Sequence, residues 1–128
     1  MKKLINKKLS DLSFEVTQNS STEPAFSGEY YSNKREGLYK CICCDENLFH
    51  SNDKYDSGSG WPSFTKVIND NKVKLIEDNT FGMKRVEVKC FNCDSHLGHV
   101  FDDGPKPDGK RFCINSVSLN FVCKNGEL

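Results

Sequence analysis

The chain has 128 residues, a length typical of one domain with a small core. Its 18 basic and 18 acidic residues give a formal net charge of zero, which argues against partners held by bulk charge, such as nucleic acid or an anionic membrane surface. No apolar run approaches the length of a membrane span, and the lysine-rich start lacks the apolar stretch of a signal peptide. We therefore expect a soluble, cytoplasmic protein.

The first half of the chain predicts little regular structure. Residues 1–12 are weakly helical, and no convincing amphipathic helix follows residue 15. Residues 19–37 are rich in turn formers and predict an irregular lead-in. A short strand is expected at 38–41, and the glycines and the proline of 51–64 indicate a loop.

The second half predicts strands. Segments 64–68 and 72–76, separated by Asn-Asp-Asn, are expected to form a hairpin. Residues 85–90 alternate cleanly between apolar and polar, and 96–112 combine a strand fragment with a Gly/Pro turn cluster. The last and longest strand is expected at 111–123. The pattern favours a mainly β, antiparallel domain with short N-terminal helical segments.

Four of the seven cysteines form two Cys-x-x-Cys pairs, Cys41 with Cys44 and Cys90 with Cys93. In a reducing compartment such pairs are more often metal ligands or redox centres than structural disulfides. Two of them complete the tetrahedral thiolate shell that zinc prefers, and a metal here would clip together two distant turns of a small domain. The alternative without a function is that the two thiol pairs are unrelated and lie apart. A thioredoxin-like role is disfavoured because no βαβ pattern surrounds either pair.

His96 and His99 follow the second pair at a zinc-finger-like spacing. Because four cysteines already fill a closed zinc site, both histidines are free for other work. They could equally be ordinary turn or core histidines, and the residues alone leave this open.

Cys113 belongs to neither pair and sits in an apolar run. On a strand, Arg111, Cys113 and Asn115 share one face, and an adjacent arginine is expected to lower the pKa of the thiol. The alternative is a small buried hydrophobe. The same parity would also place core-type residues on the pocket face, namely Val117, Leu119 and Phe121. Either the face passes from core to pocket along the length of the strand, or a bulge near Ser116 resets the register.

The only tryptophan, Trp61, lies in the loop Gly-Ser-Gly-Trp-Pro-Ser-Phe. It could plug the core, as most tryptophans do, or line a small apolar pocket beside a thiolate. We assign Phe101 to the same pocket as a second substrate-binding aromatic.

Several segments together resemble the B-type methionine sulfoxide reductases, which reduce methionine-R-sulfoxide. The resemblance runs from about Leu12 to Phe121 and rests on these segments: STEPAFSGEY, YKCICC, KYDSGSGWPSF, RVEVKCFNCDSHLGHVFDDGP and RFCINSVSLNF. It implies two antiparallel sheets with one structural zinc ion away from the active site. It also implies an N-terminal extension at 1–11, a reductase domain at 12–124 and a C-terminal tail at 125–128.

The resemblance implies a role for each remaining site residue. Cys113 would be the nucleophile that passes through a sulfenic acid, with Arg111 near its thiolate. The side chains around the sulfoxide would be His96, His99 and Asn115, with Trp61 against the methyl group.

Many members of the family carry a resolving cysteine where this chain has Ser59. We therefore expect recycling by an external reductant, namely thioredoxin, glutaredoxin or a small thiol. The substrate would be methionine-R-sulfoxide, free or in oxidised proteins, and the enzyme a monomer that binds neither nucleic acid nor membrane.

Two rival interpretations remain at this level. A zinc-ribbon binding module explains the two cysteine pairs but not Cys113, the histidines or Trp61, and it would favour a basic face. A metal chaperone or thiol sensor would use Cys43 and Cys123. Neither the physiological reductant nor the preference for free or protein-bound substrate can be deduced from the sequence.

Overall fold

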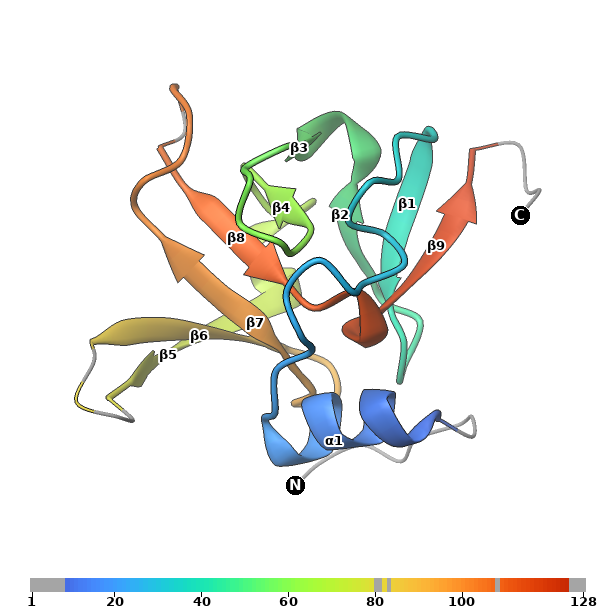
Figure 1. Ribbon diagram of the computed structural model, residues 1–128, viewed down its shortest axis with the longest axis vertical. Helices are drawn as coiled ribbons and strands as arrows, with labels where there is room; N and C mark the ends of the chain where they lie inside the picture. The colour runs from blue at the N-terminus through green and yellow to red at the C-terminus, as the bar shows by residue number, and fades with distance from the viewer. Residues whose placement is uncertain (1–8, 80–81, 83, 108, 125–128) are drawn as a thin grey trace.

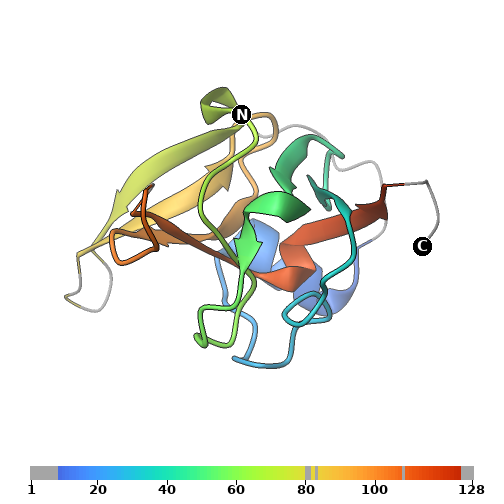
Figure 2. The ribbon, with the colours of Figure 1, turned by 90° about the horizontal axis from the view of Figure 1, so that it is seen from above.

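The computed structural model describes residues 9–79, 82, 84–107 and 109–124. In this part of the chain it contains two antiparallel sheets and one α-helix, as the sequence predicts (Figure 1). The smaller sheet has three strands in the order β2-β1-β9, and the larger has six in the order β3-β4-β8-β7-β6-β5. Figures 1 and 2 show the two sheets side by side. No helix among the described residues is long and apolar enough to cross a membrane.

Cys41 and Cys90 each end a strand, and the second cysteine of each pair lies in the turn that follows. The smaller sheet is built from β1 (Gly37–Cys41), β2 (Asn47–His50) and β9 (Leu119–Cys123). The larger sheet is built from β3 (Lys54–Tyr55), β4 (Ser63–Phe64), β5 (Val73–Asp78), β6 (Arg85–Cys90), β7 (His96–Phe101) and β8 (Arg111–Ile114).

Helix α1 spans Asp11–Asn19, later than the helical segment expected at 1–12. It begins there because the Ser10 hydroxyl accepts a hydrogen bond from the Ser13 N–H at 3.1 Å, a typical N-cap, and it ends where Ser20 adopts a φ of 58°. The buried face carries Ser13, and its hydroxyl donates to the Val117 carbonyl at 2.8 Å. Because two of the three buried residues of this helix are polar, Ser13 and Thr17, its sequence shows no amphipathic pattern. The prediction for residues 1–8 lies outside the described residues.

The prediction that 64–68 and 72–76 form a hairpin is wrong. β4 pairs with β3 and β8, whereas β5 pairs with β6. The chain between them does not turn back, because Val67 is buried in the core and the Ile68 N–H donates to the Leu48 carbonyl of the smaller sheet at 2.8 Å. A short apolar run reveals that a strand is present but not which strand it pairs with.

The single long strand predicted at 111–123 is divided in two. β8 lies in the larger sheet and β9 in the smaller, and a 3₁₀ turn at Ser116–Ser118 joins them. The turn changes which parity faces the core: Ile114 is buried before it and Leu119 after it. The register is therefore reset near Ser116, as the second alternative requires, but by a 3₁₀ turn between two strands and not by a bulge within one strand.

The core lies between the sheets and is rich in aromatic rings. Tyr39 of β1 packs edge-on against Phe64 of β4, with ring centroids 5.1 Å apart, and Phe49 of β2 stacks on the same Phe64 ring at 4.3 Å. Tyr39 also meets Phe121 of β9 at 4.8 Å. These contacts fix the larger sheet against the smaller one, and with it the position of β8 and its thiol.

Candidate active site

Cys113 lies at the centre of the larger sheet, between two neighbouring strands. It stands opposite Ser63 of β4 on one side and opposite His99 of β7 on the other. β7 can approach closely because Gly98 has no side chain: a Cβ there would lie 2.0 Å from the Cys113 carbonyl oxygen. The antiparallel pairing thus brings a thiol and an imidazole from distant parts of the sequence onto adjacent strands.

The predicted catalytic and substrate-binding residues, with one exception, line a single cavity of about 310 Å³. On β8, Arg111 and Cys113 face this cavity while Phe112 and Ile114 are buried in the core, as the strand parity predicts. The lining consists of Thr22, Ser59, Trp61, Arg85, Gly98, His99, Phe101, Arg111, Cys113 and Asn115. His96 is not part of it.

The environment of Cys113 differs from the prediction in one respect. Burial raises the pKa of this thiol, although the Ser59 hydroxyl, 3.9 Å from the sulfur, and the charge of Arg111 both oppose the rise. The expectation that Arg111 lowers the pKa below the usual range is therefore wrong: the arginine acts in the expected direction, but desolvation is the larger effect.

Arg111 shares its charge with an acidic partner. Its Nε and Nη2 donate to the two carboxylate oxygens of Asp103 at 2.9 and 3.1 Å, a bidentate pair. The guanidinium also lies over the Phe101 ring, 4.5 Å from its centroid. Asp103 and Phe101 therefore fix the arginine at the rim of the cavity, where part of its charge is neutralised.

His99 is held by a carboxylate from the edge of the sheet. Its Nε2 lies 2.8 Å from Oδ2 of Asp78 on β5, and Asp78 also pairs with Arg85 at 3.6 Å. Since Nε2 is engaged, Nδ1 is the imidazole nitrogen left for a ligand. Asp78 was missed in the sequence because its distance from His99 along the chain gives no hint of contact.

His96 lies behind His99 and is 2% exposed. Its Nδ1 is 2.6 Å from Oε2 of Glu87 on β6, and burial lowers its pKa despite this carboxylate. The two imidazole rings meet edge to face, with centroids 5.6 Å apart. His96 thus supports the ring of His99 and does not itself reach the cavity.

Trp61 and Asn115 are fixed by hydrogen bonds to the main chain. The indole Nε1 of Trp61 donates to the Glu23 carbonyl at 2.9 Å. The Asn115 amide donates from Nδ2 to the Leu97 carbonyl at 3.0 Å and accepts at Oδ1 from the Glu23 N–H, also at 3.0 Å. One amide hydrogen of Asn115 is left for a ligand in the cavity.

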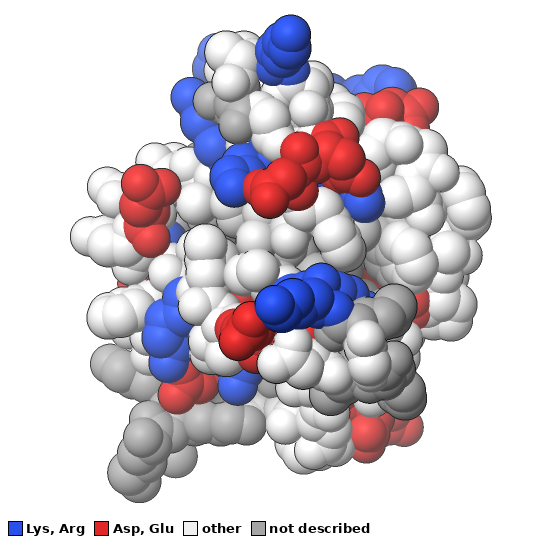
Figure 3. Space-filling model, turned by 90° about the vertical axis from the view of Figure 1, so that its left-hand side faces the viewer, with Lys and Arg blue, Asp and Glu red and all other residues white. Residues whose placement is uncertain are grey.

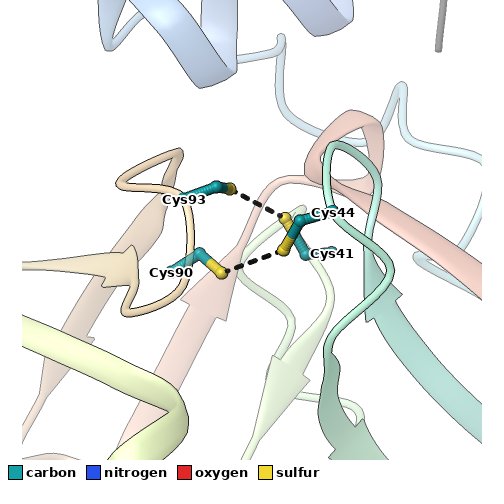
Figure 4. Close-up of side chains that lie close together, drawn as sticks. All are labelled: Cys41, Cys44, Cys90 and Cys93. Carbon is teal, nitrogen blue, oxygen red and sulfur yellow. Dashed lines mark hydrogen bonds between the residues drawn. The ribbon is translucent and has the colours of Figure 1, made fainter. Parts of the chain in front are cut away.

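The four paired cysteines converge at one point, as predicted (Figure 4). Their sulfur atoms all lie within 4.8 Å of one another, with Cys41 and Cys93 at 3.6 Å and Cys44 and Cys90 also at 3.6 Å. Thiolates bound tetrahedrally to zinc at about 2.3 Å are about 3.8 Å apart. The cluster therefore fits a metal ion and joins the β1–β2 turn to the β6–β7 turn.

The two cysteine turns repeat one backbone design. In each, an aspartate follows the second cysteine in the left-handed conformation, Asp45 with a φ of 65° and Asp94 with a φ of 64°. Each aspartate N–H donates to the carbonyl of the first cysteine, at 2.9 and 2.8 Å respectively. The pattern Cys-x-x-Cys-Asp, present twice in the sequence, was the available signal for this matched geometry.

The two remaining cysteines lie away from the cavity. Cys43 is 1% exposed and accepts from the Gln18 amide of α1 at 3.6 Å, and Cys123 pairs with Gly37 at the edge of the smaller sheet. No disulfide links any two described cysteines.

Acidic and basic side chains alternate across the face shown in Figure 3. This mixture agrees with the zero net charge and gives no basic patch on that face.

Comparison with known proteins identifies relatives over nearly the whole chain. The SelR domain matches residues 9–123. The peptide methionine sulfoxide reductases MsrB of Escherichia coli strains SE11 and 55989 are each 53% identical over 124 residues, which cover 96% of this chain and 90% of each relative.

Proposed function

The chain belongs to the SelR family, and we propose that Cys113 is its nucleophile. Its similarity to the peptide methionine sulfoxide reductases extends over nearly its full length. Its activity is the reduction of methionine-R-sulfoxide to methionine, as a peptide-methionine (R)-S-oxide reductase. The observation that carries the assignment of Cys113 is its place in the cavity: it is the thiol among the lining residues, next to His99 and Trp61.

The first step needs a proton, because the sulfur of a sulfoxide is a poor electrophile until its oxygen is protonated. His99 supplies this proton from Nδ1, the nitrogen that Asp78 leaves free. The Asp78 carboxylate fixes the ring through its contact with Nε2. His96 acts through His99, since its buried ring limits where the His99 ring can lie.

The Cys113 thiolate then attacks the sulfoxide sulfur. Oxygen passes to Cys113, which becomes a sulfenic acid, while the substrate sulfur gains two electrons and leaves as methionine. The hydroxyl of Ser59 and the cation of Arg111 stabilise the thiolate against the effect of burial. Asn115 offers its remaining amide hydrogen to the sulfoxide oxygen.

Trp61 and Phe101 form the apolar side of the cavity. The S-methyl group becomes electron-poor when the oxygen is protonated, so an aromatic face stabilises it. Three separate groups then hold the chiral sulfur: an acid at the oxygen, an aromatic ring at the methyl and a thiolate at sulfur. Such an arrangement would accept one of the two epimers and reject the other.

We propose that the metal at the four-cysteine cluster is zinc. Four thiolates in a closed tetrahedron suit zinc, and the ion would stabilise the junction of the two sheets. Four cysteine ligands would leave no open position for substrate, so the ion would have a structural role.

An external thiol completes the cycle. Cys43 is buried under α1 and Cys123 lies in the other sheet, so neither supports an internal disulfide with Cys113. Attack on the sulfenic acid by thioredoxin, glutaredoxin or a small thiol gives a mixed disulfide and water, and a second thiol releases Cys113. Seven free cysteines fit a reducing compartment, and we place a monomeric enzyme in the cytoplasm.

Turnover with purified epimers tests the proposal. The protein is incubated with R- or S-methionine sulfoxide and dithiothreitol, and methionine is quantified. We expect methionine from the R epimer alone and none with Cys113→Ser, which retains fold and metal. Appreciable turnover by Cys113→Ser would refute the nucleophile assignment.

A further inference from the structure

Glu23 is a fully buried carboxylate that the proposed chemistry does not use. It lies in the irregular segment before β1, is 1% exposed, and is not among the residues that line the substrate cavity. Its main chain nevertheless touches two residues that do line it. We propose that Glu23 is a positioning residue that holds Trp61 and Asn115 in their mutual arrangement. The inference rests on the proposed function, because it takes both side chains to contact the sulfoxide.

The main chain of Glu23 bridges the two walls of the cavity. Its carbonyl accepts from Trp61 Nε1 at 2.9 Å, and its N–H donates to Asn115 Oδ1 at 3.0 Å. Trp61 comes from the loop before β4 and Asn115 from the end of β8. The same peptide segment therefore sets the plane of the indole and the orientation of the amide, and a shift of Glu23 moves both.

The carboxylate anchors that segment. Oε1 accepts from the Val117 N–H at 3.0 Å, at the 3₁₀ turn that directly follows Asn115. The second oxygen, Oε2, lies beside Gly28. A Cβ added at Gly28 would lie 2.3 Å from this oxygen and 2.2 Å from the Ser116 hydroxyl oxygen. The absence of a side chain at Gly28 thus leaves room for the carboxylate. Val117, which binds the carboxylate, lies two residues after Asn115, whose amide accepts from the Glu23 N–H.

A second cavity explains why an anchor is needed. Glu23 also borders a space of about 610 Å³, formed with Tyr30, Ser116 and Val117 among others. Without its side chain the segment can move into this space. The indole N–H and the Asn115 amide would then lose their partners, while the core between the sheets stays intact.

Three variants separate positioning from charge and from general stability. Glu23→Ala removes the anchor. Glu23→Gln keeps the length and an oxygen that accepts from the Val117 N–H, but not the charge. Glu29→Ala is the matched control, since Glu29 borders the same second cavity but is exposed. If Glu23→Ala does not fold, Glu23→Asp replaces it, because it draws the carboxylate back from the Val117 N–H by one methylene.

The readouts are kcat/KM for methionine-R-sulfoxide, the fluorescence of Trp61, which is the only tryptophan, and the rate at which iodoacetamide alkylates Cys113. We expect Glu23→Ala to lose on the order of 10²-fold in kcat/KM and to shift the emission to longer wavelength. Alkylation of Cys113 should not slow, because the charge of Glu23 disfavours the Cys113 thiolate and its removal does not. Glu23→Gln and Glu29→Ala should stay close to wild type, and Glu23→Asp should show the same changes as alanine to a smaller degree.

Wild-type kcat/KM and emission in Glu23→Ala, or in its replacement Glu23→Asp, would overturn the inference. A Glu23→Gln variant as impaired as Glu23→Ala would also overturn it, in favour of a role for the charge. If the wild-type protein reduces no sulfoxide, the proposed function fails. The emission of Trp61 in the same variants then still decides whether Glu23 positions the indole.

Discussion

The Ser59 hydroxyl oxygen lies 3.9 Å from the sulfur of Cys113. The resemblance places at this position the resolving cysteine that many members of the family carry. A disulfide bond is about 2.05 Å long, so a sulfur atom at residue 59 would need to move by roughly 2 Å to close one. The structure thus places the side chain of residue 59 close to Cys113, but this chain has no thiol there.

Ser59→Cys should therefore restore internal resolution. After one turnover with substrate and no reductant, its intact mass should fall by two hydrogens, whereas the wild-type mass should rise by one oxygen. Ser57→Cys is the control, since the Ser57 hydroxyl contacts Ser59 and Ser63 instead of the Cys113 sulfur. A wild-type protein that loses two hydrogens, with the loss abolished by Cys123→Ser or Cys43→Ser, would show that an internal cysteine already resolves Cys113.

Arg111→Ala should shift the ionisation of Cys113 to higher pH. The thiolate is the reactive form, burial raises its pKa, and Arg111 opposes the rise, so removing the cation favours the thiol further. The alkylation rate of Cys113 at about pH 8 should fall several-fold, and its midpoint should move up. The control is Lys110→Ala, a neighbouring cation that pairs with Asp102 at the surface. An unchanged midpoint in Arg111→Ala would contradict this account of the thiol.

His99→Gln should lower kcat by about 10²- to 10⁴-fold, because the sulfoxide oxygen loses its acid. Asp78→Asn should have a smaller effect of about tenfold, since the amide keeps a hydrogen-bonding group near Nε2 but not the charge. Zinc stoichiometry should be unchanged in both, as measured by metal analysis. Glu77→Gln, an exposed neighbour on β5, serves as the control. Loss of zinc with His99→Gln would instead favour a finger-like metal site.

Cys90→Ser should release the metal and lower the free energy of unfolding by several kcal/mol, because metal binding energy is partly folding energy. Metal analysis and thermal unfolding of the purified protein test this. Cys43→Ser is the control, since Cys43 lies inside the first cysteine turn but outside the cluster. We expect one zinc ion per chain in wild type and in Cys43→Ser. A zinc-free protein of full stability would rule out the structural role.

Local patterns predicted those parts of the site that depend on spacing or strand parity. The four cysteines converge as their spacing indicates, and Arg111, Cys113 and Asn115 face one cavity because a strand alternates sides. The aromatic residues Trp61 and Phe101 also line this cavity.

Long-range partners could not be predicted in the same way. The carboxylates of Asp78 and Glu87 reach the histidines only through the pairing of β5, β6 and β7, which no local pattern specifies. Where the last strand divides, Val117 is hydrogen-bonded to the Glu23 carboxylate and to Ser13 of α1, both far away in the sequence. The raised pKa of Cys113 reflects burial, which strand parity alone does not quantify.

A single turnover is the most direct test of Cys113 as the nucleophile. The protein is mixed with one equivalent of methionine-R-sulfoxide and no reductant, in the presence of a sulfenic-acid trapping reagent, and is then analysed by peptide mass mapping. We expect one methionine per chain and the trapped adduct on Cys113. Methionine formed without modification of Cys113, or with the adduct on another cysteine, would contradict the account.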